Sequence, residues 1–211
     1  MKPFLLVLSS PSGGGKSTIA RELLASRSDL GYSVSATTRR PRAGEQDGTH
    51  YHFLSPGEFE RRVQAGDFIE HAQYGGARYG TLRSEVEGIF DSGRHAVLDI
   101  EVDGARQVRL AHPDAVLVFL LPPSGEALVG RLKGRRTENQ DAVLRRMEIA
   151  DREIANVSAY DYVVVNDDLR EAVRQVAAII DAESRRTTRL KSLEDTVARL
   201  RQELTVKRTE D

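Results

Sequence analysis

The stretch FLLVLSSPSGGGKST, residues 4–18, joins an apolar run to a glycine-rich loop. Residues 4–8 are continuously apolar, as expected of a short strand that is buried on both faces of a parallel sheet. The loop ends in Gly15-Lys16-Ser17 and leads directly into a stretch with helical spacing at residues 18–25. A strand, a glycine-rich loop and a helix in this order are typical of a P-loop, which binds the phosphates of a nucleotide.

The glycines of this loop allow successive backbone N–H groups to point inward, which forms an anion-binding nest at the start of a helix. Lys16 is expected to reach the β- and γ-phosphates of ATP, and the Ser17 hydroxyl to ligate Mg²⁺. Because both flanking elements agree, a glycine-rich turn without a ligand is the weaker interpretation. The predicted ATP-binding residues of the loop are Ser10, Pro11, Ser12, Gly13, Gly14, Gly15, Lys16, Ser17 and Thr18.

The rest of the chain repeats the same alternation. Apolar runs recur at residues 95–100, 115–121 and 160–165, and helical stretches at 104–110 and 124–132. This order predicts an α/β fold with a P-loop NTPase-type parallel sheet flanked by helices. Asp99 follows the apolar residues 96–98, at the carboxyl edge of the sheet where ligand sites gather. We expect it to orient Mg²⁺ through water, with a helix cap or a structural ion pair as the alternative.

Two segments interrupt the alternation. In the first, from about residue 35 to residue 93, residues 49–54 and 68–74 alternate at period two, and Ser55-Pro56-Gly57-Glu58 has the pattern of a helix capping box. This segment predicts a small, partly antiparallel α+β insertion at the edge of the sheet. The second, at residues 133–139, is rich in glycine and arginine and joins two helical segments, which predicts a mobile connection between them.

The C-terminal tail, residues 185–211, has a different pattern. Leu190, Leu193, Val197, Leu200 and Leu204 recur at alternating three- and four-residue spacing, with charged residues between them. This stripe predicts an amphipathic helix. Either it packs on its own domain or it joins subunits of a homo-oligomer in a short coiled coil, and two heptads are marginal for the second.

Length and composition exclude several other classes of protein. With 211 residues the chain suits one compact domain with a small appendage. No apolar run approaches the ~20 residues of a membrane span, and a formal net charge of −1 argues against a general nucleic-acid surface. The chain has no cysteine, its five histidines lack metal-ligand spacing, and its N-terminus does not resemble a signal peptide. We therefore expect a cytoplasmic protein with neither a membrane nor a nucleic acid as partner.

A second cationic segment is a candidate for binding another phosphate. Arg39, Arg40 and Arg42 flank Pro41 beside several hydroxyl residues. Arginine guanidinium groups suit bidentate capture of phosphate, and the proline stiffens the turn. Taken alone, the segment could also be a solvated basic loop.

Five motifs in their order decide between these interpretations. They are VSATTRRPRAGEQDGTHY (34–51), DFIEHAQYGGARYGT (67–81), LDIEVDG (98–104), RLKGRRTE (131–138) and VVVND (163–167). Together they make residues 4 to about 184 similar to the guanylate kinase family. The resemblance implies transfer of the γ-phosphoryl group of ATP to GMP, and to dGMP as well, giving ADP and GDP in purine nucleotide metabolism, with Mg²⁺ as cofactor. It also divides the chain into a kinase-like domain, residues 1–184, with a helical lid over about residues 130–150, and the tail.

The resemblance assigns a role to each matching position. Those implied to bind GMP are Arg39, Arg42, Tyr51 and Tyr79 at the phosphate, Ser35, Glu70 and Thr81 around the guanine, and Asp99 and Glu101 nearby. On the ATP side they are Arg131, Arg135 and Arg146 from the lid, with Asn166 and Asp167 near the adenine; for these last two, a plain turn after a strand is an equal alternative. Lys16, Arg135 and Arg146 are the implied catalytic residues.

Glu70 carries the prediction of base identity. A carboxylate can accept hydrogen bonds from guanine N1–H and N2–H₂ together, whereas adenine offers no such pair of donors.

Three positions depart from the family pattern: Ser10 replaces a glycine, Glu101 stands where aspartate is frequent, and Arg136 stands where a second glycine is common. They leave open the local geometry of the loop, the part of Glu101 in base recognition and the geometry of the lid.

Two rival functions fit a chain of this kind. Guanylate-kinase-like domains also occur as non-catalytic peptide-binding modules, which have generally lost the nucleotide loop that Gly15, Lys16 and Ser17 retain here. A related kinase that acts on another phosphorylated acceptor should lack Ser35 and Glu70. An assay of several nucleoside monophosphates separates these alternatives.

Overall fold

The computed structural model describes residues 1–133 and 140–210. Its core is a five-stranded sheet in the order β2-β7-β1-β8-β9, with every pairing parallel. The strands are β1 (Leu5–Ser9), β2 (Leu30–Tyr32), β7 (His95–Asp99), β8 (Val116–Leu121) and β9 (Tyr162–Val165). Leu8 of β1 pairs with Asp99 on one side and Val118 on the other, so the carboxyl ends of these strands form one edge. The predicted α/β fold is confirmed.

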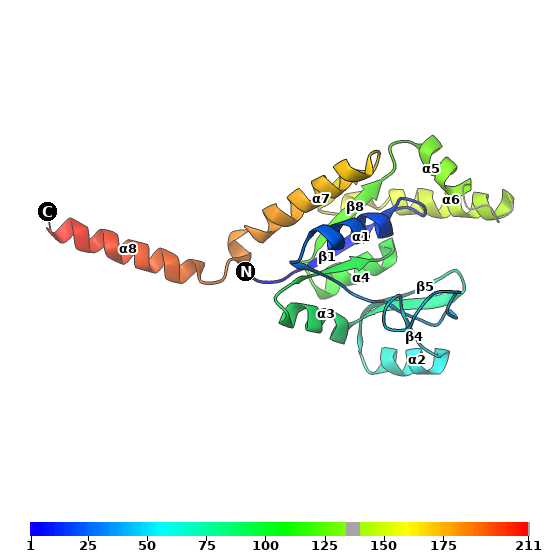
Figure 1. Ribbon diagram of the computed structural model, residues 1–211, viewed down its shortest axis with the longest axis horizontal. Coiled ribbons are helices and arrows are strands. Elements are labelled where there is room, and N and C mark those ends of the chain that lie inside the picture. The colour runs from blue at the N-terminus through cyan, green and yellow to red at the C-terminus, as the bar shows by residue number, and fades with distance from the viewer. Residues whose placement is uncertain (134–139, 211) are drawn as a thin grey trace.

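Helices cover both faces of this sheet (Figure 1). On one face α1 (Lys16–Ser26) and α7 (Leu169–Ser184) bury Ile19, Leu23 and Val176 against alternate residues of the strands. On the other face α3 (Arg83–Asp91) and α4 (Val102–Ala111) do the same with Val86 and Val108. The continuous apolar runs of the sequence are explained by this burial from two sides.

The predicted insertion folds as a unit with its own sheet. Its four strands, in the order β4-β3-β6-β5, combine one parallel pairing with two antiparallel ones. They are β3 (Ala36–Thr37), β4 (His52–Phe53), β5 (Phe68–Tyr74) and β6 (Ala77–Leu82). Helix α2 (Pro56–Gln64) begins where the capping box predicts, and the Ser55 hydroxyl accepts a hydrogen bond from the Glu58 N–H. Phe59 and Phe68 stack in the small core that this unit encloses.

Two details of this region differ from the sequence prediction. The alternating residues 49–54 yield a strand of only two residues, β4, because residues 46–50 form a turn closed by hydrogen bonds to Gln46. Strand β2 was not predicted from the sequence at all. Its three residues, LGY, include a glycine and are too few to show a period.

The lid is formed by two helices that pack on each other beside the P-loop. Helices α5 (Gly125–Lys133) and α6 (Gln140–Ile154) bury Leu128, Leu132 and Ala150 between them. The segment 134–139, with Arg135 and Arg136, lies outside the described residues, so the predictions for its mobility and geometry stay predictions.

The tail leaves the body of the molecule as a separate helix, α8 (Leu193–Glu210), which extends to the left in Figure 1. The helix is shorter than predicted, since Leu190 lies in a turn after the short 3₁₀ segment Thr187–Arg189. Val197, Leu200 and Leu204 are 45%, 50% and 65% exposed, so the alternative in which the stripe packs on its own domain is wrong. Among the described residues, no helix is long and apolar enough to cross a membrane.

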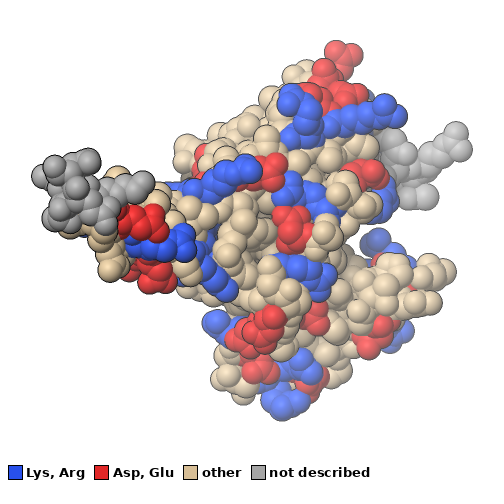
Figure 2. All heavy atoms as spheres, turned by 60° about the vertical axis from the view of Figure 1, so that its left-hand side comes forward, with Lys and Arg blue, Asp and Glu red and all other residues tan. Residues whose placement is uncertain are grey.

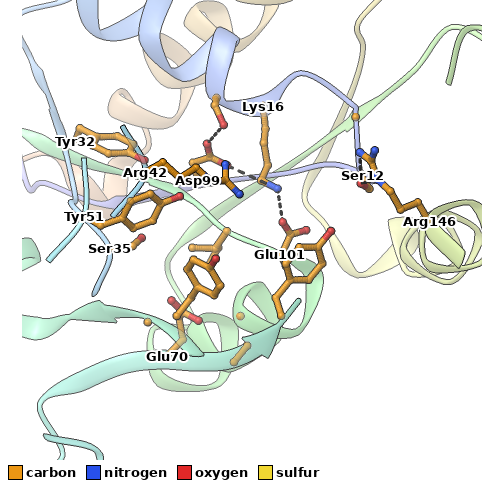
Figure 3. A pocket seen from close by; sticks show the side chains of 18 residues that line it. Ser12, Lys16, Tyr32, Ser35, Arg42, Tyr51, Glu70, Asp99, Glu101 and Arg146 are labelled. Atoms are coloured by element: carbon orange, nitrogen blue, oxygen red, sulfur yellow. Dashed lines mark hydrogen bonds and ion pairs between the residues drawn. The ribbon is translucent and has the colours of Figure 1, made fainter. Parts of the chain in front are cut away.

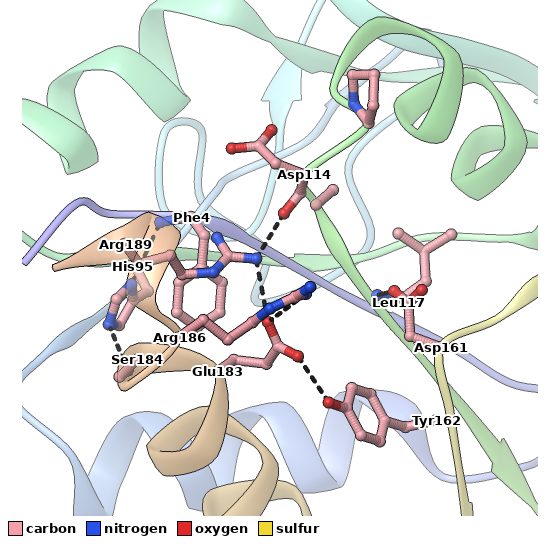
Figure 4. Close-up of polar contacts among 12 residues, drawn as sticks. Phe4, His95, Asp114, Leu117, Asp161, Tyr162, Glu183, Ser184, Arg186 and Arg189 are labelled. Atoms are coloured by element: carbon pink, nitrogen blue, oxygen red, sulfur yellow. Dashed lines mark hydrogen bonds and ion pairs between the residues drawn. The ribbon is translucent and has the colours of Figure 1, made fainter.

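A buried polar cluster fixes the start of this tail to the core (Figure 4). The Arg189 guanidinium donates to the Asp114 carbonyl at 2.7 Å and to the Glu183 carboxylate at 3.2 Å, and it lies over the Phe4 ring. The Tyr162 hydroxyl donates to the other oxygen of Glu183 at 2.6 Å. The tail is therefore anchored through Arg189, before α8 begins.

Candidate functional site

One cleft of about 630 Å³ lies between the carboxyl edge of the core sheet and the insertion. The P-loop, the residues after β7 and helix α6 contribute one side, and β5 and β6 contribute the other. Figure 3 shows Lys16, Asp99 and Glu101 close together, with Arg146 beside Ser12 and with Glu70 rising from the opposite side. Predicted residues that are far apart in sequence thus meet in one cavity.

The P-loop has the backbone conformation that its glycines allow. Gly13 and Gly15 have φ of 84° and 92°, a region that L-residues with side chains rarely adopt. A Cβ on Gly14 would lie 2.9 Å from the Pro11 carbonyl oxygen, so this position also requires glycine. Ser10 does not have a positive φ, and its buried hydroxyl donates to the Pro11 carbonyl at 3.1 Å. The replacement of the first glycine therefore causes no backbone strain.

Lys16 is paired with two carboxylates at the base of the loop. Its ammonium nitrogen lies 2.6 Å from Glu101 Oε1 and 3.8 Å from Asp99 Oδ1. Burial by itself would lower the pKa of Lys16, but the Glu101 and Asp99 carboxylates outweigh it and raise the pKa above its usual value. Lys16 is therefore held as a cation, directed into the cleft.

Ser17 and Asp99 form an oxygen-rich corner beside this lysine. The Ser17 hydroxyl donates to Asp99 Oδ2, and the buried Asp99 Oδ1 has no hydrogen-bond partner among the described residues. Burial raises the pKa of Asp99, despite the opposing effects of Lys16 and Ser17. A hydroxyl beside a carboxylate with a spare oxygen fits Mg²⁺, which prefers oxygen ligands and keeps several waters and substrate phosphates.

Helix α6 holds the tip of the P-loop through two side chains. Arg146 donates to the Ser12 hydroxyl at 3.2 Å and 3.1 Å, and Glu153 accepts from the Ser12 N–H at 3.0 Å. Burial, together with the nearby Glu101 carboxylate, raises the pKa of Glu153 to about 7. Glu153 was not predicted from the sequence. The one signal that could have identified it is its spacing of seven residues from Arg146, which places both residues on one face of the helix.

Two of the residues predicted for the ATP side, Arg131 and Asn166, support the P-loop without lining the cleft. Arg131 donates to the Asn166 carbonyl at 2.8 Å, and the Asn166 amide donates to the Gly14 carbonyl at 2.8 Å. Asn166 is buried, whereas Asp167 is exposed. Pro11 and Thr18 complete the loop outside the cleft, and Arg135 lies outside the described residues.

The insertion contributes the predicted phosphate-binding residues. Arg42, Tyr51 and Tyr79 line the cleft, and the rings of the two tyrosines lie 6.0 Å apart. Arg39 does not line it, since its guanidinium makes hydrogen bonds of 2.9 Å and 2.8 Å to the two oxygens of Glu45. Glu45 was not predicted from the sequence, and it shows that Arg39 can hold a bidentate oxyanion.

The insertion side of the cleft also contains a buried carboxylate, Glu70. This residue is only 4% exposed, and its Oε1 accepts from the Thr81 hydroxyl at 2.7 Å. Burial raises the pKa of Glu70 to about 7, although the bond from Thr81 opposes the shift. Ser35 lines the same cavity, as do Tyr32 and Tyr74, which sequence reasoning missed. A buried carboxylate at the end of a cavity is suited to read a planar ligand that presents N–H donors.

Comparisons with known proteins agree with this geometry. The family model described as guanylate kinase matches residues 2–183. A guanylate kinase of Symbiobacterium thermophilum is 50% identical over 89% of both chains, and one of Clostridium perfringens is 46% identical over 89% of this chain and 87% of the relative. The crystal structure of guanylate kinase from Anaplasma phagocytophilum superposes with a TM-score of 0.75 at 34% identity, covering 92% of each chain.

Proposed function

The chain belongs to the guanylate kinase family, and we propose that the cleft between the core sheet and the insertion binds ATP against the P-loop and GMP against the insertion. The activity is the transfer of a phosphoryl group from ATP to GMP. One observation supports the two-sided assignment most strongly. Lys16, the cation of a phosphate-binding loop, and Glu70, a buried carboxylate that suits guanine, line the same cavity from opposite sides.

The proposed mechanism is an in-line transfer in which positioning and charge neutralisation supply the catalysis. No general base is required, because the accepting phosphate oxygen of GMP is already an anion. Lys16 and Arg146, with Arg135 from the lid, would stabilise the charge on the transferring group, where such cations are worth ~10³ to 10⁵ in rate. On binding ATP, Lys16 would exchange its contact with Glu101 for the phosphates.

Mg²⁺ is proposed as the cofactor, held by the Ser17 hydroxyl and, through water, by Asp99. When bound, it would neutralise charge on the β- and γ-phosphates. The hydrogen bond between Ser17 and Asp99 supports this proposal, since it keeps the hydroxyl and the carboxylate side by side at the start of α1.

On the acceptor side, Arg42, Tyr51 and Tyr79 would hold the phosphate of GMP. Arg39 would join them by exchanging the Glu45 carboxylate for the phosphate, which has a similar arrangement of oxygens. Glu70 would accept from guanine N1–H and N2–H₂, with Ser35 and Thr81 beside it. Binding in this mode requires the ionised form of Glu70.

We propose further that residues 1–184 form the kinase domain, with the insertion at about 35–93 and the lid at about 130–150, and that residues 185–211 form a separate tail. The end of the family match at residue 183 supports this division. Use of dGMP, a role in purine nucleotide metabolism, a cytoplasmic location and assembly through the tail remain predictions. Acidic and basic side chains are interspersed on the face shown in Figure 2, which favours small charged ligands over a nucleic acid.

The experiment is a coupled assay of ADP formation from ATP with GMP, dGMP, AMP and UMP in turn. The proposal predicts turnover with GMP and dGMP and at most weak turnover with AMP and UMP. Equal rates with AMP and GMP would refute the role of Glu70. Tight peptide binding without turnover of any of these acceptors would favour the scaffold alternative.

A further inference from the structure

Helix α4 of the core contacts strand β5 of the insertion directly. This contact matters for the base pocket because β5 carries Glu70 and forms the edge of the second sheet. The remaining base-side residues, Ser35 and Thr81, belong to the insertion itself. Whatever fixes β5 on α4 therefore fixes the base pocket relative to the P-loop.

Gln107 makes a two-point contact with the backbone of β5. Its amide nitrogen donates to the His71 carbonyl at 2.9 Å, and its amide oxygen accepts from the His71 N–H at 3.2 Å. A primary amide has the same donor and acceptor pair as a peptide group, so Gln107 acts as one residue of a neighbouring strand. Glu70, the next residue along β5, is held by this contact.

Gly104, one turn earlier in α4, lies against the Glu70 carboxylate. A Cβ at this position would be 2.6 Å from Glu70 Oε2 and 3.1 Å from its Cδ. The backbone at Gly104 does not have a positive φ, so glycine is not needed for its conformation. The absence of a side chain is explained by the space that the carboxylate occupies.

We propose that Gln107 and Gly104 are positioning residues for recognition of the acceptor base. Gln107 fixes the strand that bears Glu70, and Gly104 leaves the space in which the Glu70 carboxylate faces the base. This inference rests on the proposed role of Glu70 and extends it to a helix that belongs to the core. It differs from a purely structural role, which would hold the two units together without affecting the choice of base.

The test compares GMP with inosine 5′-monophosphate, which lacks the exocyclic amine of guanine. Gln107→Met keeps the length of the side chain and removes both hydrogen bonds. We expect KM for GMP to rise about tenfold, KM for ATP to stay within about twofold, and the preference for GMP over inosine monophosphate to fall. Gln175→Met is the matched control, because Gln175 is also a half-buried helix residue but lies on α7, bonded to Glu171.

Gly104→Ala provides a second variant with a different expected effect on stability. Alanine favours a helix more than glycine does, so the melting temperature should stay unchanged or rise. The Glu70 carboxylate is the flexible end of its side chain and can move away from the added methyl group, which should raise KM for GMP. A rise in KM for GMP with full stability cannot come from loss of folding.

Combination with Glu70→Gln separates this inference from the proposed function. If Gln107 acts through Glu70, the effects of Gln107→Met and Glu70→Gln on the preference for GMP over inosine monophosphate will not add. Additive effects, or an unchanged KM for GMP in both Gln107→Met and Gly104→Ala, would overturn the inference alone. An unchanged preference in Glu70→Gln itself would overturn the proposed role of Glu70 and the inference with it.

Discussion

The two sides of the cleft recognise their nucleotides in different ways. On the P-loop side, the proposed ligand groups are backbone N–H groups and cations such as Lys16, which bind phosphates and are shared by every nucleotide. On the insertion side, Glu70 is a buried acceptor, and the proposed mode of binding distinguishes guanine from adenine by the donors of the base. If both assignments hold, specificity depends on the acceptor site and rate depends on the donor site.

The two sides also differ in how their charges are satisfied. In the free protein Lys16 is paired with Glu101, and Arg39 with Glu45, so carboxylates hold both cations in place. Among the residues that the structure describes, Glu70 has only Thr81 as a hydrogen-bond partner, and burial raises its pKa to about 7. In the proposed binding mode, the phosphates replace the carboxylates of Glu101 and Glu45 as partners of the two cations. Guanine instead supplies hydrogen-bond donors to the Glu70 carboxylate, which accepts few hydrogen bonds in the free protein.

Lys16→Ala tests the donor side and should have the largest effect. We expect kcat to fall at least a hundredfold, in the order-of-magnitude range for loss of one preorganised charge, with folding intact. The measurement is steady-state kinetics with GMP and ATP, together with a thermal melt. Lys191→Ala is the control, because Lys191 is exposed in the tail. Near-normal turnover in Lys16→Ala would refute the P-loop assignment.

The pH dependence of kcat/KM for GMP tests the acceptor side, and we expect it to change about tenfold. Because the proposed binding of GMP requires ionised Glu70, kcat/KM for GMP should fall as the pH falls through the pKa of about 7, roughly tenfold between pH 8 and pH 6. Glu70→Gln retains every other titrating group, Glu153 included, so the fall in kcat/KM between pH 8 and pH 6 should be about tenfold smaller in that variant. A profile identical in both proteins would contradict the assignment.

The raised pKa of Glu70 predicts that stability changes with pH in the opposite direction to kcat/KM. The pKa of Glu70 is raised in the folded state from 4.5 to about 7, so the folded protein binds this proton more tightly than the unfolded chain. The contribution of Glu70 to stability is full below pH 4.5 and is lost as the pH rises through 7. Urea unfolding of the unliganded enzyme and of Glu70→Gln across this range measures the effect.

Shortening the tail should have the smallest effect on catalysis. A chain that ends at Lys191 keeps Arg189 and loses only α8, so kcat, both KM values and the melting temperature should match those of the full chain. A chain that ends at Arg185 loses Arg189 and leaves Glu183 buried without a cation, which should lower the free energy of unfolding by about 3 kcal/mol. A fall in kcat on removal of α8 alone would show that the tail contributes to the site.

Sedimentation of the full chain and of the chain ending at Lys191 tests the coiled-coil prediction at the same time. A smaller assembly after removal of α8 would support subunit association through Val197, Leu200 and Leu204. Identical assemblies would contradict it.

The donor side was predictable from the sequence because its conformation is encoded in contiguous residues. The glycines at positions 13 and 15 indicate a loop that needs positive φ values, and these residues have them. The spacing of the apolar residues on either side indicates the flanking strand and helix. Glu153 was not predictable, since its contact with Ser12 spans 141 positions and depends on how α6 docks. The same limit applies to the contact of Gln107 with β5.

On the acceptor side, the arginine segment 39–42 was a candidate phosphate site from its residues, whereas the base-binding residues were predicted only through family resemblance. Periodicity indicated strand β5, but the convergence of Glu70 with Thr81 depends on the register of β5 with β6, which includes an irregularity between Phe68 and Glu70. A shift by one residue would turn Glu70 away from the pocket. In the tail, the stripe of apolar residues identified the helix but not its start, because Leu190 fits the spacing and lies outside α8.

The central claim is that Glu70 reads the acceptor base while the P-loop side binds the phosphates of ATP. The direct test is kcat/KM for GMP and for AMP, measured at saturating ATP, in the full chain and in Glu70→Gln, with the exposed Glu87→Gln as control. The account predicts a fall of about a hundredfold for GMP in Glu70→Gln alone, with KM for ATP unchanged. An undiminished preference for GMP over AMP in folded Glu70→Gln would contradict it.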